Sequence, residues 1–160
     1  MEIRRFKKED AEAVAAVVCE TAAVSNAKDY PPEYIEELKR THTAEVLLER
    51  AAQGHMYVAC ADGKIVGTGT VAPFWGSVTE SILLTIFVLP AYQGKGIGRA
   101  LIETLEQDEY ALRANRIEIP ASLTGVDFYR HLGYEYKDGI TEPENGLMYR
   151  LEKRKAVTSD

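Results

Sequence analysis

The stretch ILLTIFVLPAYQGKGIG, residues 82–98, decides the fold of this chain. Its first part, Ile82–Val88, is apolar at almost every position, which is typical of a strand buried on both faces. Pro90 ends that strand, and Gln93–Gly98 then carries three alternating glycines directly before the amphipathic stretch Arg99–Glu106. Such a glycine loop leaves several backbone N–H groups at the start of the helix without an intrahelical acceptor. Together with the positive end of the helix dipole, these groups predict a binding site for an anion such as phosphate.

Two common phosphate loops do not fit this stretch. A nucleotide-triphosphate loop needs a glycine five residues before Gly94 and a hydroxyl residue after Lys95. The chain has Leu89 and Gly96 at those two positions. The dinucleotide fingerprint needs a third glycine where this chain has Arg99, and it follows the first strand of a parallel unit.

A third loop type does fit. Gln93-x-x-Gly96-x-Gly98 resembles the loop of the GNAT superfamily of acyl-CoA-dependent N-acyltransferases, which begins with Arg or Gln. The wider block Val88–Gly98, followed by a helix, is similar to the central block of that family. Phe128–Tyr134, with its Phe-Tyr pair and Gly-Tyr end, is similar to the C-terminal block. The order of elements also matches, so the resemblance extends over most of the chain.

The resemblance implies acetyl-CoA as cofactor and coenzyme A as product. It places the pyrophosphate on the loop amides, with charge added by Lys95 and Arg99. It also implies that the main chain of Phe87 and Val88 pairs with the pantetheine arm, and that a strand N–H there polarises the acyl carbonyl. The predicted cofactor-binding residues are Phe87, Val88, Gln93, Gly94, Lys95, Gly96, Ile97, Gly98 and Arg99.

Two catalytic candidates follow from the same resemblance. Tyr129 occupies the tyrosine position of the Phe-Tyr block, where a phenol protonated at neutral pH can donate a proton to the departing sulfur. Many family members carry a glutamate inside the strand before the loop, but this chain has Leu83–Thr85 there. Glu80, at the start of the strand, is the nearest carboxylate and is the candidate general base. Thr85 orienting a water molecule, or an acceptor that arrives neutral, are the alternatives.

Acceptor recognition is expected at two places, because loops near a rigid site commonly carry recognition. The first is the junction of the first two helical segments, with Tyr30 and Tyr34. The second is the loop Pro73–Thr79, with Phe74 and Trp75. The predicted substrate-binding residues are Tyr30, Tyr34 and Trp75.

Other polar residues carry less information. Ser122 stands where the family often has an asparagine that helps to hold the cofactor. The three histidines show no ligand spacing and are predicted to be surface or cap residues, so no metal is expected. The two cysteines are scattered and are predicted to be buried thiols. These residues are His42, His55, His131, Cys19 and Cys60.

Composition limits the choice of partners. The 160-residue chain has a formal net charge of −6, which argues against nucleic acid and is compatible with steering of cationic amines. No apolar run approaches the roughly 20 residues of a membrane span. The N-terminus lacks the apolar core of a signal peptide, so a cytoplasmic location without membrane binding is expected. Exposed strand edges are compatible with a homodimer.

The periodicity predicts an α+β fold with three layers, α-β-α, and a mixed, mainly antiparallel central sheet covered by helices on both faces. Residues 1–152 are expected to form one domain, and residues 153–160 a charged, frayed tail. The predicted helices lie at 10–24, 33–53 with a kink near 41–43, 97–112 and 124–133. The predicted strands lie at 3–6, 56–61, 64–72, 81–88, 116–120, 134–136 and 147–151.

Two functions from different classes remain open on these residues. The first is an N-acetyltransferase that moves an acetyl group from acetyl-CoA to a primary amine of a small molecule or an exposed peptide amino group, by direct attack in a ternary complex. The second is a non-catalytic acyl-CoA-binding module, which the missing strand glutamate suggests. Tyr129 favours the acyltransferase.

Overall fold

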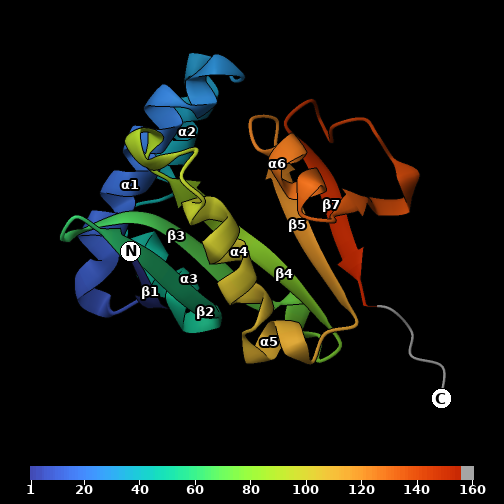
Figure 1. Ribbon diagram of the computed structural model, residues 1–160. Coiled ribbons are helices and arrows are strands. Elements are labelled where there is room, and N and C mark those ends of the chain that lie inside the picture. Colours follow the sequence, from blue (N-terminus) through green and yellow to red (C-terminus); the bar gives the residue numbers. More distant parts are fainter. Residues whose placement is uncertain (156–160) are drawn as a thin grey trace.

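The computed structural model describes residues 1–155, and within that range it contains a seven-stranded sheet (Figure 1). The strand order is β1-β2-β3-β4-β5-β7-β6. Neighbouring strands are antiparallel except for β4 and β5, so the predicted mixed sheet is confirmed. The strands are β1 Glu2–Arg5, β2 His55–Ala61, β3 Lys64–Pro73, β4 Glu80–Val88, β5 Arg116–Ser122, β6 Glu135–Tyr136 and β7 Met148–Arg154.

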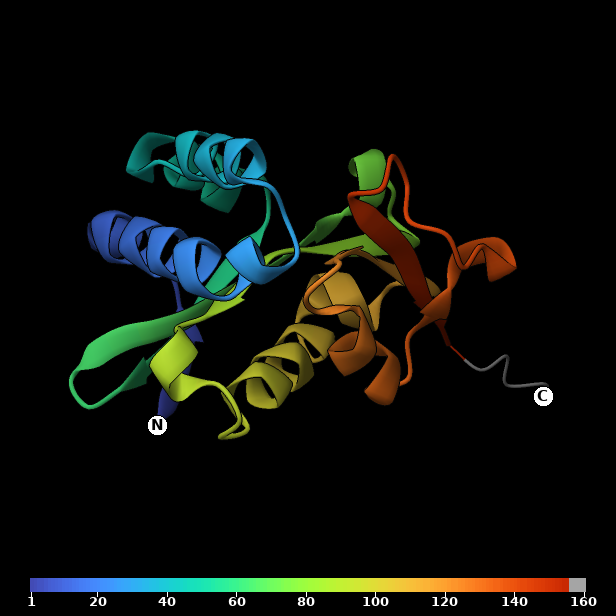
Figure 2. The same cartoon turned by 90° about the horizontal axis from the view of Figure 1, so that it is seen from above.

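Helices cover both faces of the sheet, as predicted. The first three lie on one face, and α4, α5 and α6 lie on the other (Figure 2). The helices are α1 Ala11–Val24, α2 Pro32–Arg40, α3 Ala44–Gln53, α4 Ile97–Glu106, α5 Glu109–Leu112 and α6 Val126–His131. None of the helices within residues 1–155 is both long enough and apolar enough to cross a membrane.

Side-chain caps divide two helical regions that the periodicity left continuous. The expected kink near residues 41–43 is a complete break, and the Thr43 hydroxyl accepts a hydrogen bond from the Val46 N–H to begin α3 (3.4 Å). The predicted helix to residue 112 is wrong in the same way. Asp108 interrupts it, because its carboxylate accepts from the Tyr110 N–H at the start of α5 (2.9 Å) and from the Tyr57 hydroxyl (2.6 Å).

Asp-Gly between two alternating apolar runs is typical of a hairpin turn, and the turn between β2 and β3 lies at Asp62 and Gly63. Asp62 and Gly63 both have positive φ, 53° and 75°. This backbone matches the two-residue turn whose twist suits a hairpin.

The start of α6 differs from the capping box that the pattern Thr124-x-x-Asp127 predicts. Gly125 is the residue before the helix, and its N–H donates to the Ser122 hydroxyl (2.9 Å). The predicted end at Gly133 is confirmed, with a φ of 99° that suits glycine.

Close contact between α4 and β3 fixes the helix on the sheet. A Cβ atom at Gly69 would lie only 3.0 Å from Cδ1 of Leu105, so a larger residue at this strand position would press against the helix. The apolar stripe of the helix, formed by Ile97, Leu101 and Leu105 at helical spacing, is buried. The N-terminus of α4 is therefore held in a fixed position beside β4.

The sheet opens between β4 and β5. The two strands pair in parallel over only three residue pairs, from Glu80↔Arg116 to Ile82↔Glu118. Beyond this point they separate, and Figure 1 shows β5 and β7 diverging from the rest of the sheet. Burial along β4 alternates rather than covering both faces, because residues 84–88 border the space between the strands.

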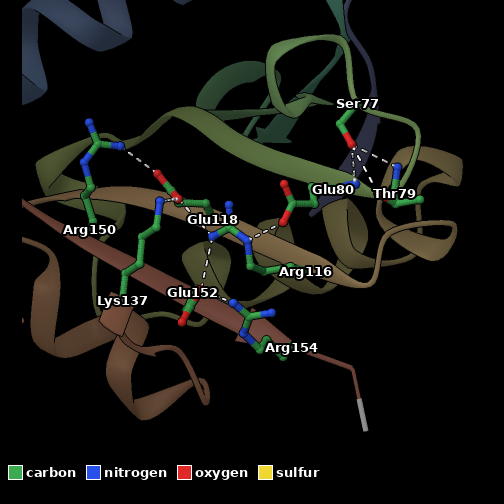
Figure 3. A network of polar contacts seen from close by, with 9 residues as sticks. All are labelled: Ser77, Thr79, Glu80, Arg116, Glu118, Lys137, Arg150, Glu152 and Arg154. Atoms are coloured by element: carbon green, nitrogen blue, oxygen red, sulfur yellow. Dashed lines mark hydrogen bonds and ion pairs between the residues drawn. The ribbon is translucent and has the colours of Figure 1, made fainter. Parts of the chain in front are cut away.

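A buried ion cluster holds the closed end of this opening (Figure 3). The carboxylate of Glu118 is fully buried and accepts hydrogen bonds from Arg116 (2.9 Å), Lys137 (2.9 Å) and Arg150 (2.8 Å). Burial alone would raise the pKa of Glu118, but the hydrogen bonds from Lys137 and Arg116 outweigh burial and lower that pKa. The cluster thus contains a carboxylate that stays ionised inside the protein.

Arg116 extends the cluster to the neighbouring strands. Its Nε donates to Glu80 on β4 (2.9 Å), and its Nη1 donates to Glu152 on β7 (3.2 Å). The cluster therefore joins β4, β5 and β7 at the point where the sheet begins to open.

The C-terminal strand extends further than expected. β7 continues through Lys153 and Arg154, which were expected in a frayed tail, and Lys153 Nζ lies 2.9 Å from Glu106 Oε2. The rest of the predicted tail, residues 156–160, lies outside the described residues.

We predict that Glu118→Gln lowers the free energy of unfolding by about 3 kcal/mol, because it leaves three buried or half-buried cations without their shared anion. Urea denaturation measures this loss. The matched control is Glu144→Gln, which removes an exposed carboxylate 3.1 Å from Arg150 and is expected to cost no more than about 1 kcal/mol. Equal losses in the two variants would contradict the role of the buried cluster.

The same variant has a predicted pH dependence. Because folding lowers the pKa of Glu118, its contribution is complete above the unfolded pKa of about 4.3 and is lost as the pH falls toward the lowered value. The stability difference between wild type and Glu118→Gln should therefore be constant near neutral pH and shrink in acid. A difference that grows in acid would contradict the assignment.

Candidate active site

A cavity of about 870 Å³ lies where β4 and β5 separate. The carboxyl half of β4 and the glycine loop form one side of it, and β5 with α6 forms the other. Residues of α1, α2 and α3 close it from the opposite face of the sheet. The cavity therefore joins the predicted anion loop to the C-terminal block within one space.

The glycine loop presents unpaired amides to this cavity. Within the described chain, no acceptor is found for the N–H groups of residues 94–99, and the first intrahelical bond runs from Ala100 N–H to Gly96 O (3.0 Å). Gly94 and Gly96 have φ of 75° and 84°, and a Cβ at either position would meet no atom within 4 Å. The backbone thus lies beside open space that a ligand can occupy.

The side chains of the loop differ in position. Gln93 Nε2 donates to Ser25 Oγ (3.0 Å) and to Val88 O (2.9 Å), so this side chain ties the loop to α1 and β4. Of the nine predicted cofactor residues, Lys95 and Ile97 do not line the cavity. The seven that do are Phe87, Val88, Gln93, Gly94, Gly96, Gly98 and Arg99.

A bulge interrupts β4 next to the cavity. Thr68 pairs with Phe87 and Thr70 pairs with Leu84, so Thr85 and Ile86 together oppose a single residue of β3. Thr85 has a φ of 54°, an unusual value for a β-branched residue. A bulge leaves backbone groups outside the ladder and re-aims them, here on a strand that lines the cavity.

Tyr129 lies on the other side of the cavity. Its side chain is buried and lines the space, and no hydrogen-bond partner of its hydroxyl is found within residues 1–155. Burial raises the pKa of the phenol, so the group is protonated at neutral pH. Phe128, which a Cβ at Gly98 would approach to 3.1 Å, packs between α6 and the glycine loop.

Glu80 lies elsewhere. It is in the ion cluster with Arg116 and is not among the residues that line the cavity. Glu37 on α2 is the carboxylate residue found in the lining, within the part of the chain that the structure describes. Glu37 is exposed and also forms an ion pair with Arg40.

Only one of the two expected acceptor regions lines the cavity. Tyr30 and Tyr34 line the cavity with their rings stacked at 4.1 Å. The Tyr30 hydroxyl donates to Leu147 O (2.6 Å) and accepts from the Leu123 N–H (2.8 Å), so it ties the two sides of the cavity together. Trp75 is 88% exposed and lies outside the lining.

A polar group that the sequence reading missed lines the cavity. Arg50 Nη1 on α3 donates to Thr85 Oγ1 (3.2 Å) and to His42 Nε2 (2.9 Å). His42 Nδ1 lies 2.7 Å from Leu38 O and donates to it. Burial and the neighbouring Arg50 charge both lower the pKa of His42, so its ring is neutral. The contact with Leu38 O, in the last turn of α2, agrees with the prediction that His42 is a cap residue, but the ring also lines the cavity, which was not predicted.

One signal could have indicated Arg50. It follows Leu47 by three residues, and such residues share a helix face. Leu47 is fully buried, so a charged residue on the same face marks a polar environment inside the fold. Cys19 and Cys60 are free and half-buried, and neither lines the cavity.

Comparison with known proteins agrees with this geometry. Residues 52–136 match the family described as "Acetyltransferase (GNAT) domain". An uncharacterized N-acetyltransferase of Archaeoglobus fulgidus is 32% identical over 150 residues, covering 91% of this chain and 97% of that protein. The uncharacterized N-acetyltransferase YjgM of Escherichia coli is 34% identical over 90 residues, covering 53% of this chain and 54% of that protein.

A solved structure has the same fold. The PaiA N-acetyltransferase of Thermoplasma acidophilum, crystallised in complex with coenzyme A, superposes with a TM-score of 0.81 at 24% identity, over 96% of this chain and 98% of that one. The family match and the extended identity to the archaeal N-acetyltransferase go beyond this shared fold. The chain belongs to the GNAT acetyltransferase family and is an acyltransferase.

Proposed function

We propose that the chain transfers an acetyl group from acetyl-CoA to a primary amine by direct attack in a ternary complex. The acceptor is a small molecule or an exposed peptide amino group. The observation that carries this proposal is the row of unpaired amides at residues 94–99, which opens into the same cavity as the Tyr129 phenol. When bound, acetyl-CoA supplies an acetyl group activated as a thioester.

The glycine loop fits the pyrophosphate of that cofactor. Phosphate oxygens accept hydrogen bonds from amides at a helix N-terminus, and the dipole of α4 favours their charge. Open space at Gly94 and Gly96 allows the approach, and Arg99 adds a positive charge at the cavity wall. The relative from Thermoplasma acidophilum was crystallised with coenzyme A, which supports the same ligand here.

The β4 backbone fits the pantetheine arm and the acyl carbonyl. Beyond Ile82 the strand edge is not paired with β5, so its backbone groups are available to an extended ligand. The Val88 carbonyl already accepts from Gln93 and, at 3.3 Å, from Thr21, so a ligand N–H there would share the acceptor. The bulge at Thr85 and Ile86 is the place where a freed N–H polarises the carbonyl.

Proton transfer completes the reaction. The amine nitrogen forms a bond to the acyl carbon, the carbon–sulfur bond breaks, and the Tyr129 phenol donates its proton to the departing sulfur. Glu80 is held by Arg116 outside the cavity, so we assign removal of the amine proton to water in the cavity rather than to that side chain. A cytoplasmic location and a homodimer stay predictions.

We predict that Gly96→Val abolishes measurable acetyl-CoA binding in isothermal titration calorimetry, because the side chain fills the space that the phosphate needs. Gly63→Val is the matched control. Gly63 also has positive φ, 75° against 84°, and open space around its Cβ, but it lies in the β2–β3 turn. Both variants should lose similar stability, and the control should keep its affinity. Unchanged affinity in Gly96→Val would refute the loop assignment.

We predict that Tyr129→Phe lowers kcat by about ten- to a thousandfold, the range of a lost general acid or below it, while the Kd for acetyl-CoA changes little. The phenol has no protein partner within the described residues, so its removal should not unfold the chain. Tyr110→Phe on α5 makes the same chemical change outside the cavity and should leave kcat unchanged. Full activity in Tyr129→Phe would exclude the acid role.

A further inference from the structure

Arg50 is a cation without a matching anion on the α3 side of the cavity. Its Nη1 donates to Thr85 and to the neutral ring of His42, and neither partner carries a charge. Within residues 1–155, Arg50 forms no ion pair with a carboxylate. Glu37, the carboxylate residue in the lining, pairs with Arg40 instead.

The remaining donors of Arg50 are available to a ligand. A guanidinium has five N–H donors in a planar fork, and Nη1 accounts for two of them. No acceptor for Nη2 or Nε is found in the described part of the chain, although the side chain is half-buried and lines the cavity. Two parallel N–H groups from a guanidinium match the two oxygens of a carboxylate.

His42 and Thr85 hold this fork in place. His42 Nε2 accepts from Arg50 while Nδ1 donates to Leu38 O, so the ring has no free nitrogen and serves as a positioning residue. The ring also packs edge-on against Phe87 at 5.7 Å. An arginine fixed by two neutral acceptors keeps its full charge for a third group.

We propose that Arg50 binds a carboxylate carried by one of the two substrates at the reaction centre. The role of this carboxylate in catalysis rests on the proposed acetyl transfer, whereas its binding by Arg50 does not. Arg50 contacts Thr85 at the β4 bulge, and the proposed mechanism assigns the acyl carbonyl to this bulge. The carboxylate is therefore only a few bonds from the reacting nitrogen or carbonyl.

Two sources of such a carboxylate fit this position. A free α-amino acid carries it one carbon from the amino group that would attack. A dicarboxylic acyl group, such as succinyl, carries it at the end of the acyl chain. The amino group of a peptide N-terminus has no carboxylate at that distance.

The first arm of the test compares kcat/KM for free α-amino acids with that for their carboxamides, with acetyl-CoA as donor. The two acceptors have nearly the same shape. The amino group of the carboxamide is the weaker base, so a larger fraction of it is neutral and able to attack. Amine basicity alone would therefore favour the carboxamide. The second arm compares succinyl-CoA with butyryl-CoA on one amine acceptor. Each comparison is made with wild type, Arg50→Gln, Arg50→Lys and the exposed control Arg113→Gln on the surface beyond α5.

We expect the wild-type protein to prefer the carboxylate-bearing substrate in one of the two arms. That arm then shows whether the acceptor or the acyl donor carries the carboxylate. Arg50→Gln should lower kcat/KM for the carboxylate substrate by about ten- to a hundredfold, as for the loss of a charged hydrogen bond, and leave the neutral partner nearly unchanged. Arg50→Lys should recover part of the preference, because it restores the charge without the fork. Arg113→Gln should behave as wild type.

A loss in Arg50→Gln that is equal for charged and neutral substrates would overturn the inference and indicate that Arg50 only supports the bulge. An absence of carboxylate preference in both arms would overturn it as well, while turnover of neutral amines would leave the proposed function intact.

A binding measurement covers the case in which no acceptor is turned over. Saturation-transfer NMR of N-acetyl-leucine against N-acetyl-leucinamide, and of succinate against butyramide, needs no catalysis. Binding of a carboxylate that is lost in Arg50→Gln would support the inference even if the proposed function fails. Binding of none of the four compounds, or binding that is independent of Arg50, would overturn it.

Discussion

The short parallel pairing of β4 with β5 is the constraint on which the rest of this structure depends. After three residue pairs the strands separate, and the cavity forms in the space between them. A strand edge that leaves a sheet loses hydrogen bonds and needs other interactions to keep its direction. The buried carboxylate of Glu118 and the guanidinium of Arg116 supply them, by joining β4, β5 and β7 at the closed end.

The source of the positive potential differs between the loop end and the α3 side of the cavity. At the loop end the positive potential comes from backbone amides, a helix dipole and the side chain of Arg99, an arrangement suited to a phosphate. On the α3 side it comes from one guanidinium held by neutral acceptors. Tyr129 lies in the same cavity as an uncharged donor, in a chain whose formal net charge is −6. The two proposed anion sites, in an acidic protein, would favour a ligand with negative groups at a defined separation.

Local patterns predicted the elements, and tertiary contacts decided what the patterns could not. The Asp62-Gly63 turn and the glycine loop depend on neighbouring residues, so the sequence was sufficient for them. Glu80 looked like an available carboxylate because its partner Arg116 is 36 residues away in the chain. Arg50 was missed because its partners, eight and 35 residues away, meet it only in the folded chain. Ion clusters and cavity walls of this kind depend on the fold as a whole.

The most direct test of the glycine-loop assignment is an amide NMR titration of the ¹⁵N-labelled chain with acetyl-CoA. We expect saturable binding in which the amides of residues 94–99 shift and gain protection from hydrogen exchange, because these groups acquire phosphate acceptors. Amides of the Asp62-Gly63 turn should not respond. Binding that leaves residues 94–99 unchanged, or no binding at all, would contradict the assignment of the glycine loop and of the cavity that it opens into.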